Sequence, residues 1–296
     1  MADTKFLKDN LTGFIPQDIA AGILNDIARG SSIMQLSDIK QMKTDHMEFN
    51  VWADKPGAYW VNESERINTS KASWIKARME AKKLAVIIPV TKEKLNDVTI
   101  NVFEELKPEI AQAFYTAIDK ACLFGEASPF AKNVFDVAQK VQATGLLVDD
   151  ISATMAAIEE NEIDPNGFVS SISLKKELRN LKDDSNNSLA VMSLKENSLF
   201  ELPLSFCRNG AFNKETAQLI CADWSKSIFG IREGIEFEIL KEATLHNVTM
   251  EDGKPLSLAE NDMVAIKATM RVGYLPIKDK AFAVLEPEAR VKAKSK

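Results

Sequence analysis

Histidine and cysteine are scarce in this chain, which has two histidines and three cysteines among 296 residues. The cysteines, Cys122, Cys207 and Cys221, are odd in number and far apart, and none belongs to a C-x-x-C pair. This spacing argues against a disulfide framework and against a structural zinc site. His46 and His246 stand far apart in the sequence, so neither has a nearby histidine partner. The thiols are expected to fill small apolar spaces in a core.

The motifs that identify common active sites are missing as well. The chain contains no G-x-G-x-x-G, no G-x-x-x-x-G-K-[ST], no H-E-x-x-H and no G-x-S-x-G. Ser173 and Lys176 match the bare S-x-x-K pattern, but the companion motifs are absent, and a serine that opens a helix explains the match better. We therefore expect no catalytic residue, no metal ion and no cofactor.

An excess of positive charge is also missing, since 37 Lys and Arg residues face 43 Asp and Glu residues, for a formal charge of -6. A protein devoted to gripping duplex nucleic acid usually carries a basic excess, so that role is not expected. No stretch approaches the roughly 20 apolar residues that cross a bilayer, and residues 1–10 lack the apolar core of a signal peptide. No membrane partner is expected, and the chain is predicted to stay in the cytoplasm where it is made.

Hydrophobic periodicity predicts one long helix and one long strand. Apolar residues recur every three or four positions from Asp97 to Phe124, which predicts a helix with one apolar face, kinked or divided at Pro108. From Val264 to Tyr274 one apolar residue stands at every second position, the period of a strand. A shorter helix is expected over Gln17–Ala28, where Gly30 would end it.

Shorter patterns divide the rest of the chain. We expect helices beginning at Asp150, as an N-cap, and at Leu174. Ile110 and Phe114, on the apolar face of the long helix, are expected to pack on strands of the closing segment. Further strands are predicted at Ile75–Lys82, Leu84–Val90, Phe168–Ser171, Gln218–Ala222, Ser227–Ile231, Gly234–Leu240 and Ala281–Leu285.

The segment Asp54–Ser73 stands out because it holds Tyr59 and Trp60 among polar residues and turn formers. Too little apolar surface surrounds these aromatic side chains to offset the entropy of ordering about 20 residues. Two interpretations are open: a disordered loop with stray aromatics, or a long ribbon that becomes ordered against a partner. The strand patterns that flank the segment favour the ribbon.

Four stretches of the sequence stand out when they are taken in order: Phe49–Val61 with Glu63, Ile87–Glu93 with Phe103–Pro108 and Ala117–Gly125, Ala222–Lys226 with Ile228–Arg232, and Asp262–Ala268 with Lys280–Leu285. Together they resemble the major capsid proteins of tailed double-stranded DNA bacteriophages, which have the Hong Kong 97-type fold. The first resembles the start of the family's extended loop, and the second resembles the strand that leads into its spine helix. The third is similar to a D-[FW]-S/D-K … G-I-R hairpin, and the fourth to a closing strand pair.

The resemblance implies an α+β protein with an N-terminal arm, an extended β-ribbon loop, a peripheral domain with a long spine helix, and an axial α/β domain. The implied boundaries are 1–44 for the arm, 45–83 for the extended loop, 84–132 for the peripheral domain, 133–222 for the axial domain, 223–286 for closing strands mainly of the peripheral domain, and 287–296 for a flexible basic tail.

The resemblance also implies the function. The chain is expected to be a non-enzymatic capsid protein that assembles with itself, as hexamers and pentamers, into an icosahedral shell around phage double-stranded DNA. Expected partners are a separate scaffolding protein, a portal protein and DNA held by non-specific enclosure; the expected location is the virion, after assembly in the host cytoplasm. The extended loop is expected to contact the adjacent subunit through Lys55, Pro56, Gly57, Tyr59, Trp60, Arg66, Lys71 and Trp74.

Two alternatives stay open at this point. A bacterial encapsulin nanocompartment shares the fold and would enclose an enzyme cargo instead of DNA, although the long aromatic loop resembles phage proteins more closely. A soluble α+β enzyme with an unrecognised site is the remote alternative. Some members of the capsid family begin with a fused scaffolding segment of about a hundred residues. Here about 45 residues precede the loop, which is why a separate scaffolding protein is expected.

Overall fold

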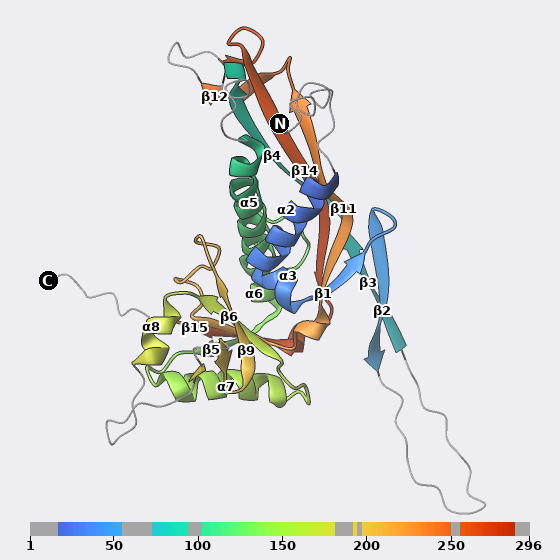
Figure 1. Ribbon diagram of the computed structural model, residues 1–296. Coiled ribbons are helices and arrows are strands. Elements are labelled where there is room, and N and C mark those ends of the chain that lie inside the picture. Colours follow the sequence, from blue (N-terminus) through green and yellow to red (C-terminus); the bar gives the residue numbers. More distant parts are fainter. Residues whose placement is uncertain are drawn as a thin grey trace, which may run out of the picture.

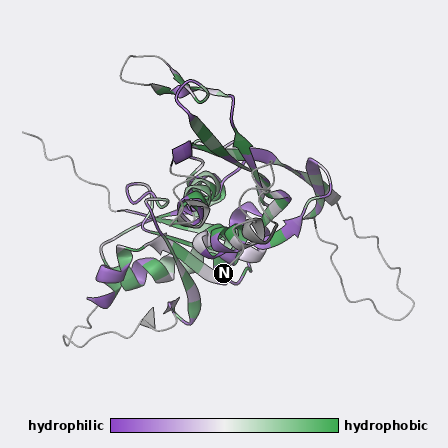
Figure 2. Cartoon of the chain, turned by 45° about the horizontal axis from the view of Figure 1, so that its top comes forward, coloured by the Kyte–Doolittle hydropathy of each residue, from purple (hydrophilic) through white to green (hydrophobic). Residues whose placement is uncertain are grey.

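The computed structural model describes residues 17–54, 73–93, 102–180, 192–193, 197–249 and 255–287. Figure 1 shows two units, an elongated one built on a sheet of long strands and a lower one built on short strands, with the β2–β3 ribbon projecting to the side. In Figure 2 the helices at the centre of the view carry hydrophobic and hydrophilic residues side by side, as amphipathic helices that cover a sheet do.

The elongated unit holds a four-stranded sheet in the order β1-β11-β14-β4. The central pair, β11 and β14, is antiparallel, and β14 also pairs with β4 in antiparallel fashion. The predicted strand Val264–Tyr274 is confirmed within β14. The strands and helices of this unit are α2 (Gln17–Gly30), α3 (Ser32–Leu36), β1 (Asp38–Gln41), β4 (Lys82–Thr91), α5 (Val102–Phe124), β11 (Ser227–Leu240) and β14 (Met263–Pro276).

The prediction of two separate strands at Ser227–Ile231 and Gly234–Leu240 is wrong. Both lie in β11, a single strand of 14 residues whose pairing with β14 shifts register between Ile231 and Glu236. In the sequence the polar residues Arg232 and Glu233 separate the two strand patterns, which predicted a break. In the structure a β-bulge accommodates them, and the strand continues. The small hairpin of β12 (Thr244–Thr249) and β13 (Pro255–Ser257) follows.

Helices α5 and α2 lie together against one face of this sheet (Figure 1). Helix α5 is one element from Val102 to Phe124 and Pro108 does not divide it; the predicted start at Asp97 falls outside the described residues. Ile110 and Phe114 are 3% and 1% exposed, in the same hydrophobic cluster as the β14 residues Met270 and Val272. The cluster also takes in Ile23 and Ile27 of α2, so the N-terminal helix contributes to the core that covers α5.

The lower unit is a seven-stranded sheet in the order β5-β15-β10-β6-β9-β8-β7. Every residue of β6 and β10 is buried, because α7 and neighbouring segments cover the sheet. The predicted strands Phe168–Ser171 and Gln218–Ala222 are confirmed to within one residue. The elements are α6 (Val134–Val137), β5 (Gln139–Gln142), α7 (Leu147–Glu159), β6 (Gly167–Ser171), α8 (Leu174–Arg179), β7 (Met192–Ser193), β8 (Ser198–Leu199), β9 (Leu202–Cys207), β10 (Leu219–Ala222) and β15 (Phe282–Glu286).

The expected hairpin at Ala222–Arg232 is wrong, because β10 belongs to the seven-stranded sheet and β11 to the four-stranded one. The short 3-10 helix η1 (Trp224–Lys226) carries the chain from one sheet to the other. The expected closing pair is wrong for the same reason: β14 and β15 lie in different sheets, joined through η2 (Asp279–Ala281).

The two crossings lie side by side and are held by hydrogen bonds. The backbone N–H of Asp223 donates to the Ala281 carbonyl at 2.9 Å, and that of Ile277 donates to the Lys226 carbonyl at 2.8 Å. The buried Trp224 donates its indole Nε1–H to the Gly167 carbonyl at 3.1 Å. Since one hydrophobic cluster also extends through both units, these contacts fix how one unit sits on the other.

Of two predicted helix starts, the one at Asp150 is wrong and the one at Leu174 is confirmed. Helix α7 begins at Leu147, and Asp150 is not its N-cap. The buried Asp150 carboxylate instead accepts hydrogen bonds from the preceding loop, from the backbone N–H and hydroxyl of Thr144 and the N–H of Gly145. Ser173 does occupy the N-cap position of α8, but its side chain makes no capping hydrogen bond there.

The three cysteines are free and buried, in agreement with their expected place in the core. Burial raises the pKa of the Cys122, Cys207 and Cys221 thiols above the ordinary thiol range. A thiol that stays protonated is a poor nucleophile and a poor metal ligand, so these side chains act as small apolar fillers.

Candidate assembly interface

The ribbon of β2 (His46–Asp54) and β3 (Ser73–Glu80) is the described part of the predicted extended loop. The two strands pair with each other in antiparallel register, His46 opposite Glu80 and Val51 opposite Ile75, and form a separate two-stranded sheet. An isolated two-stranded ribbon is marginally stable in water, so it needs packing against another part of a structure. The expectation of strands flanking Asp54–Ser73 is confirmed.

The base of the ribbon is anchored by two methionines that enter a gap in the four-stranded sheet. Gly230 of β11 pairs with Gly273 of β14, so two neighbouring positions lack side chains. Met42 and Met79, each 1% exposed, fill this space. A Cβ at Gly230 would lie 2.5 Å from Met79 Cε, and one at Gly273 would lie 2.9 Å from Met79 Cγ. Both distances are too short for a side chain, so the glycines make room for the anchor.

Charged residues surround this anchor. Arg271 of β14 pairs with Asp45 at 3.1 Å and with Glu233 at 3.2 Å, while Arg232 lies 3.6 Å from the same Asp45 carboxylate. The backbone of Asp45 also accepts a hydrogen bond from the N–H of Ala81 at 2.8 Å. Asp45 precedes β2 and Ala81 follows β3, so these contacts tie both ends of the ribbon to the sheet.

Toward its tip the ribbon exposes apolar side chains. Trp74 is 54% exposed and Ile75 is 61% exposed, whereas Met79 of the same strand is buried. Trp74 is the one predicted interface residue that lies among the described residues. The other predicted interface residues lie outside them: Lys55, Pro56, Gly57, Tyr59, Trp60, Arg66 and Lys71.

A buried carboxylate joins α5 to α3. Asp119 accepts hydrogen bonds from the Ser31 hydroxyl at 2.6 Å and from the backbone N–H groups of Ser32 and Ile33 at 3.0 and 3.2 Å. Burial raises the pKa of Asp119 from 3.8 to about 6, and these hydrogen bonds only partly oppose that rise. The sequence contains no local signal for this contact, because its partners are more than 80 residues apart.

Ser32, which donates to Asp119, also contacts the seven-stranded unit. The Ser205 hydroxyl of β9 donates to Ser32 Oγ at 2.8 Å, and Cys207 Sγ lies 3.2 Å from the same oxygen. Asp119 is thus part of a hydrogen-bonded chain that runs from α5 through α3 to the seven-stranded sheet, which makes it a second connection between the two units.

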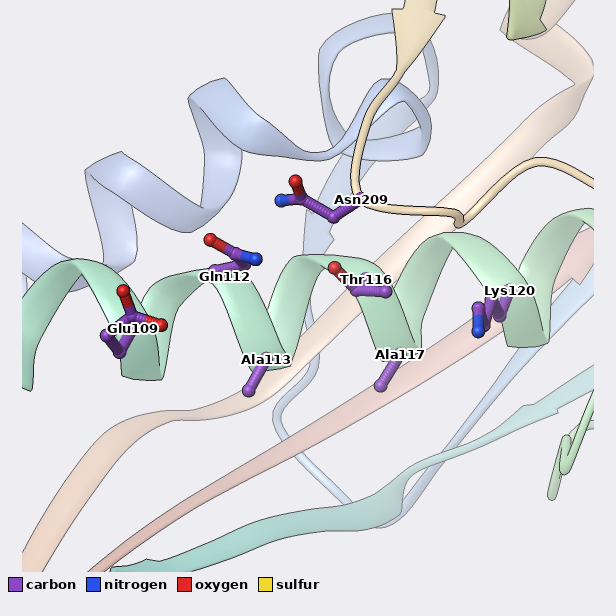
Figure 3. A pocket seen from close by; sticks show the side chains of 7 residues that line it. All are labelled: Glu109, Gln112, Ala113, Thr116, Ala117, Lys120 and Asn209. Atoms are coloured by element: carbon purple, nitrogen blue, oxygen red, sulfur yellow. The ribbon is translucent and has the colours of Figure 1, made fainter.

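A shallow groove of about 410 Å³ runs along α5, between the helix and the loop after β9. Figure 3 shows Asn209 of this loop above the helix on the side of Gln112 and Thr116, with Ala113 and Ala117 turned the other way. Asn209 donates a hydrogen bond to the Tyr115 hydroxyl, which holds the loop against the helix. The groove leaves a polar strip of α5 accessible, lined by Glu109, Gln112, Ala113, Thr116, Ala117, Lys120 and Asn209.

The described ranges contain no cluster of three or more His, Cys, Asp or Glu side chains placed to hold a metal ion. Nor does any helix within them combine the length and the apolar composition needed to cross a membrane.

The fold of this mixed α/β chain is similar to the folds of chains in solved structures of phage proteins. A protein of Microbacterium phage Oxtober96 superposes with a TM-score of 0.77 at 27% identity, covering 88% of this chain and 91% of that one. A chain from the capsid of an empty GTA particle has a TM-score of 0.65 at 15% identity, covering 88% of this chain and 90% of that one, and it supports the fold alone.

The sequence comparisons agree with the fold. The major capsid protein of Staphylococcus phage 80alpha is 38% identical over 292 residues, covering 96% of this chain and 88% of that protein. The model described as the phage capsid family matches residues 12–286, and this chain belongs to that family. Its function is that of a phage major capsid protein, and its location is the capsid of the virion. The family and the 38% identical relative support the phage capsid interpretation over the encapsulin alternative.

Proposed function

We propose that this chain has the Hong Kong 97-type fold and forms the shell by laying its extended loop, residues 45–83, across the adjacent subunit. In this assignment α5 is the spine helix of the peripheral domain, and the seven-stranded unit is the axial domain that lines the centres of hexamers and pentamers. The separation of the two sheets at η1 and η2 supports that division. By the same topology β15 joins the axial domain, although it follows the peripheral strand β14 in sequence.

The main support for the proposal is that the apolar side chains of β3 become more buried from Ile75 toward Met79. Ile75, Ala77, Met79 and Ala81 alternate in sequence as one apolar face, yet only Met79 and Ala81 are buried by the chain itself. Covering a side chain of isoleucine size contributes about 1.5–3 kcal/mol relative to leaving it in water. A neighbouring copy can supply this cover at Ile75, whereas a ribbon that points away from its own subunit cannot.

The chemistry of the chain suits a shell around DNA. A formal charge of -6 repels the packaged phosphates and so prevents tight binding to them. Enclosure of double-stranded DNA is then non-specific, and the chain needs no enzymatic activity of its own. Assembly in the host cytoplasm, with separate scaffolding and portal proteins, remains a prediction from the family resemblance.

The test replaces Ile75 by serine and uses Ile87→Ser as the matched control. Ile87 lies on β4, is 44% exposed, and belongs to the sheet and not to the ribbon. We expect both variants to melt like the parent chain, while Ile75→Ser alone lowers the association constant about tenfold or more, since 1.4 kcal/mol corresponds to a factor of ten. Sedimentation and negative-stain microscopy measure the assembled fraction. Equal assembly of the two variants would show that the ribbon does not contact a neighbour.

A further inference from the structure

A cationic pocket lies where the two units meet, between the end of α2, α5, α8 and β9. Its volume is about 290 Å³, and three positive side chains line it: Arg29, Lys175 and Arg208. Asn197 and Ser205 contribute an amide and a hydroxyl to the same lining. No aspartate or glutamate is among the residues that line it. A concave site with several cations, hydrogen-bond donors and no carboxylate is built to receive an anionic group.

The charges of this pocket are not compensated within the described part of the chain. Arg29 and Arg208 make no ion pair with any described residue. Lys175 donates to Asn197 Oδ1 at 3.2 Å and lies 4.3 Å from the centroid of the Phe206 ring, but it too lacks a carboxylate partner among the described residues. Guanidinium groups can bind carboxylates through two parallel hydrogen bonds. Because Arg29 and Arg208 have no carboxylate partner among the described residues, both can form such pairs.

The opposite charge gathers at the end of α7. Four exposed carboxylates stand within six residues, and none of them forms an ion pair with a described residue. They lie at the helix C-terminus, where the helix dipole disfavours negative charge, and the last turn of α7 contains no basic residue. This acidic turn consists of Glu159, Glu160, Glu162 and Asp164.

The acidic turn and the cationic pocket lie at opposite ends of one strand. Asp164 comes shortly before β6 begins at Gly167, and Ile172, which lines the pocket, comes directly after β6 ends at Ser171. Five residues of strand span about 17 Å. The acidic turn therefore does not reach the pocket of its own chain, but the arrangement suits a head-to-tail contact between copies, in which two different patches of one subunit meet.

We propose that the acidic turn of one subunit docks in the cationic pocket of the next copy. The proposal rests on the proposed function, since it requires that copies of the chain assemble. It adds a charged contact at the junction of the two units, distinct from the apolar contact of the ribbon. Partial exposure of the charges makes this contact sensitive to salt and favours orientation of the incoming subunit.

The test reverses the charge of each patch. The pocket variant carries Arg29→Glu and Arg208→Glu, and the turn variant carries Glu159→Lys and Glu160→Lys. Lys176→Glu with Lys214→Glu is the control for the pocket variant, because it gives the same change in net charge at exposed lysines that do not line the pocket. Each patch variant alone is expected to assemble at least tenfold less than the parent chain, while the control assembles normally.

Recombination of the variants identifies the contact as one between subunits. In an equimolar mixture, the reversed pocket of one variant meets the reversed turn of the other, so assembly measured by sedimentation is expected to recover. A chain that carries all four substitutions is expected to recover as well. Thermal melting of each variant within a few degrees of the parent chain shows that folding is intact.

The experiment distinguishes failure of the docking contact from failure of the proposed function. If the parent chain and the control form shells but neither the mixture nor the fourfold variant recovers, the docking contact is wrong and the proposed function stands. If the turn variant assembles normally while the pocket variant does not, the pocket takes another anion, which also overturns the contact. If the parent chain itself forms no assembly under any condition, the proposed function fails.

Discussion

Strand β3 of the ribbon and strand β6 of the seven-stranded sheet show two uses of apolar residues. In β6 every residue is buried by the chain's own sheet and helices. In β3 burial changes along the strand, from Ile75 at 61% exposed to Met79 at 1%. Hydrophobic burial thus stabilises the subunit in one region, whereas in the other apolar surface stays exposed, available for the proposed contact with a neighbouring subunit.

The comparison shows what an apolar pattern can and cannot indicate. Alternation over Ile75–Lys82 indicates a strand with one face to be covered, and this is confirmed as far as Glu80, where β3 ends; Lys82 already begins β4 of the four-stranded sheet. It does not indicate which chain supplies the cover. Substitutions within the intrachain core are therefore expected to change stability, whereas substitutions at the exposed end of the ribbon are expected to change assembly.

The largest effect on stability is expected for Phe114→Ala in α5. Phe114 is 1% exposed within the hydrophobic cluster that joins both units. Loss of its ring leaves a cavity and is expected to lower the free energy of unfolding by about 3–5 kcal/mol. Denaturant unfolding of the unassembled chain measures this, with Ile87→Ala as an exposed control expected to cost below about 1 kcal/mol. Unchanged melting of Phe114→Ala would contradict its place in the core.

The next effect concerns Asp119 and depends on pH. Folding raises the pKa of this carboxyl from 3.8 to about 6, so between these pH values the folded chain binds more protons than the unfolded chain. The stabilisation by protonated Asp119 is therefore complete below about pH 4 and is lost as the pH rises through about 6.

Asp119→Asn keeps a neutral group of similar shape and removes this titration. The parent chain is expected to lose on the order of 2–3 kcal/mol relative to Asp119→Asn between pH 4 and pH 7. Thermal unfolding of both chains across that range measures the difference. Parallel pH profiles would show that Asp119 stays ionised in the fold.

A smaller effect is expected at the base of the ribbon. An alanine Cβ at Gly273 would meet Met79 Cγ at 2.9 Å and the Glu80 carbonyl at 3.0 Å, whereas at Gly234 it would meet nothing within 4 Å. Gly273→Ala is expected to cost about 1–3 kcal/mol by overpacking, and Gly234→Ala to be nearly neutral. Melting temperatures of the two variants provide the comparison, and equal values would show that the methionine anchor is loosely packed.

The type and length of long periodic helices and strands could be predicted from the sequence better than their arrangement in sheets. The periods of α5 and β14 extend over many residues, so their type and approximate bounds could be predicted. Nothing in Ala222–Arg232 shows that the strands on either side of Trp224 belong to different sheets, because sheet membership depends on distant partners. The anchor formed by Met42 and Met79 could not be predicted either, because it depends on the pairing of Gly230 with Gly273.

The candidate interface shows the same limit. The composition of Asp54–Ser73 predicted a partner-dependent ribbon, and the flanking strands are confirmed. All eight predicted contact residues stay predictions, and seven of them lie outside the described residues. The cationic pocket was not predicted, because Arg29, Lys175 and Arg208 come from three distant segments. Charge counts along the sequence can reveal the acidic turn at residues 159–164, but not the pocket that matches it.

The most direct test of the account replaces Lys55–Ser70 by a short Gly-Ser turn and measures sedimentation of the shortened chain. The described hydrophobic core is formed by residues outside this segment, whereas assembly is proposed to depend on it. The shortened chain is expected to be a folded, soluble protein that melts at the temperature of the parent subunit and forms no shells. Closed particles of normal size, or a chain that cannot fold, would contradict the claim that the ribbon is reserved for a neighbouring subunit.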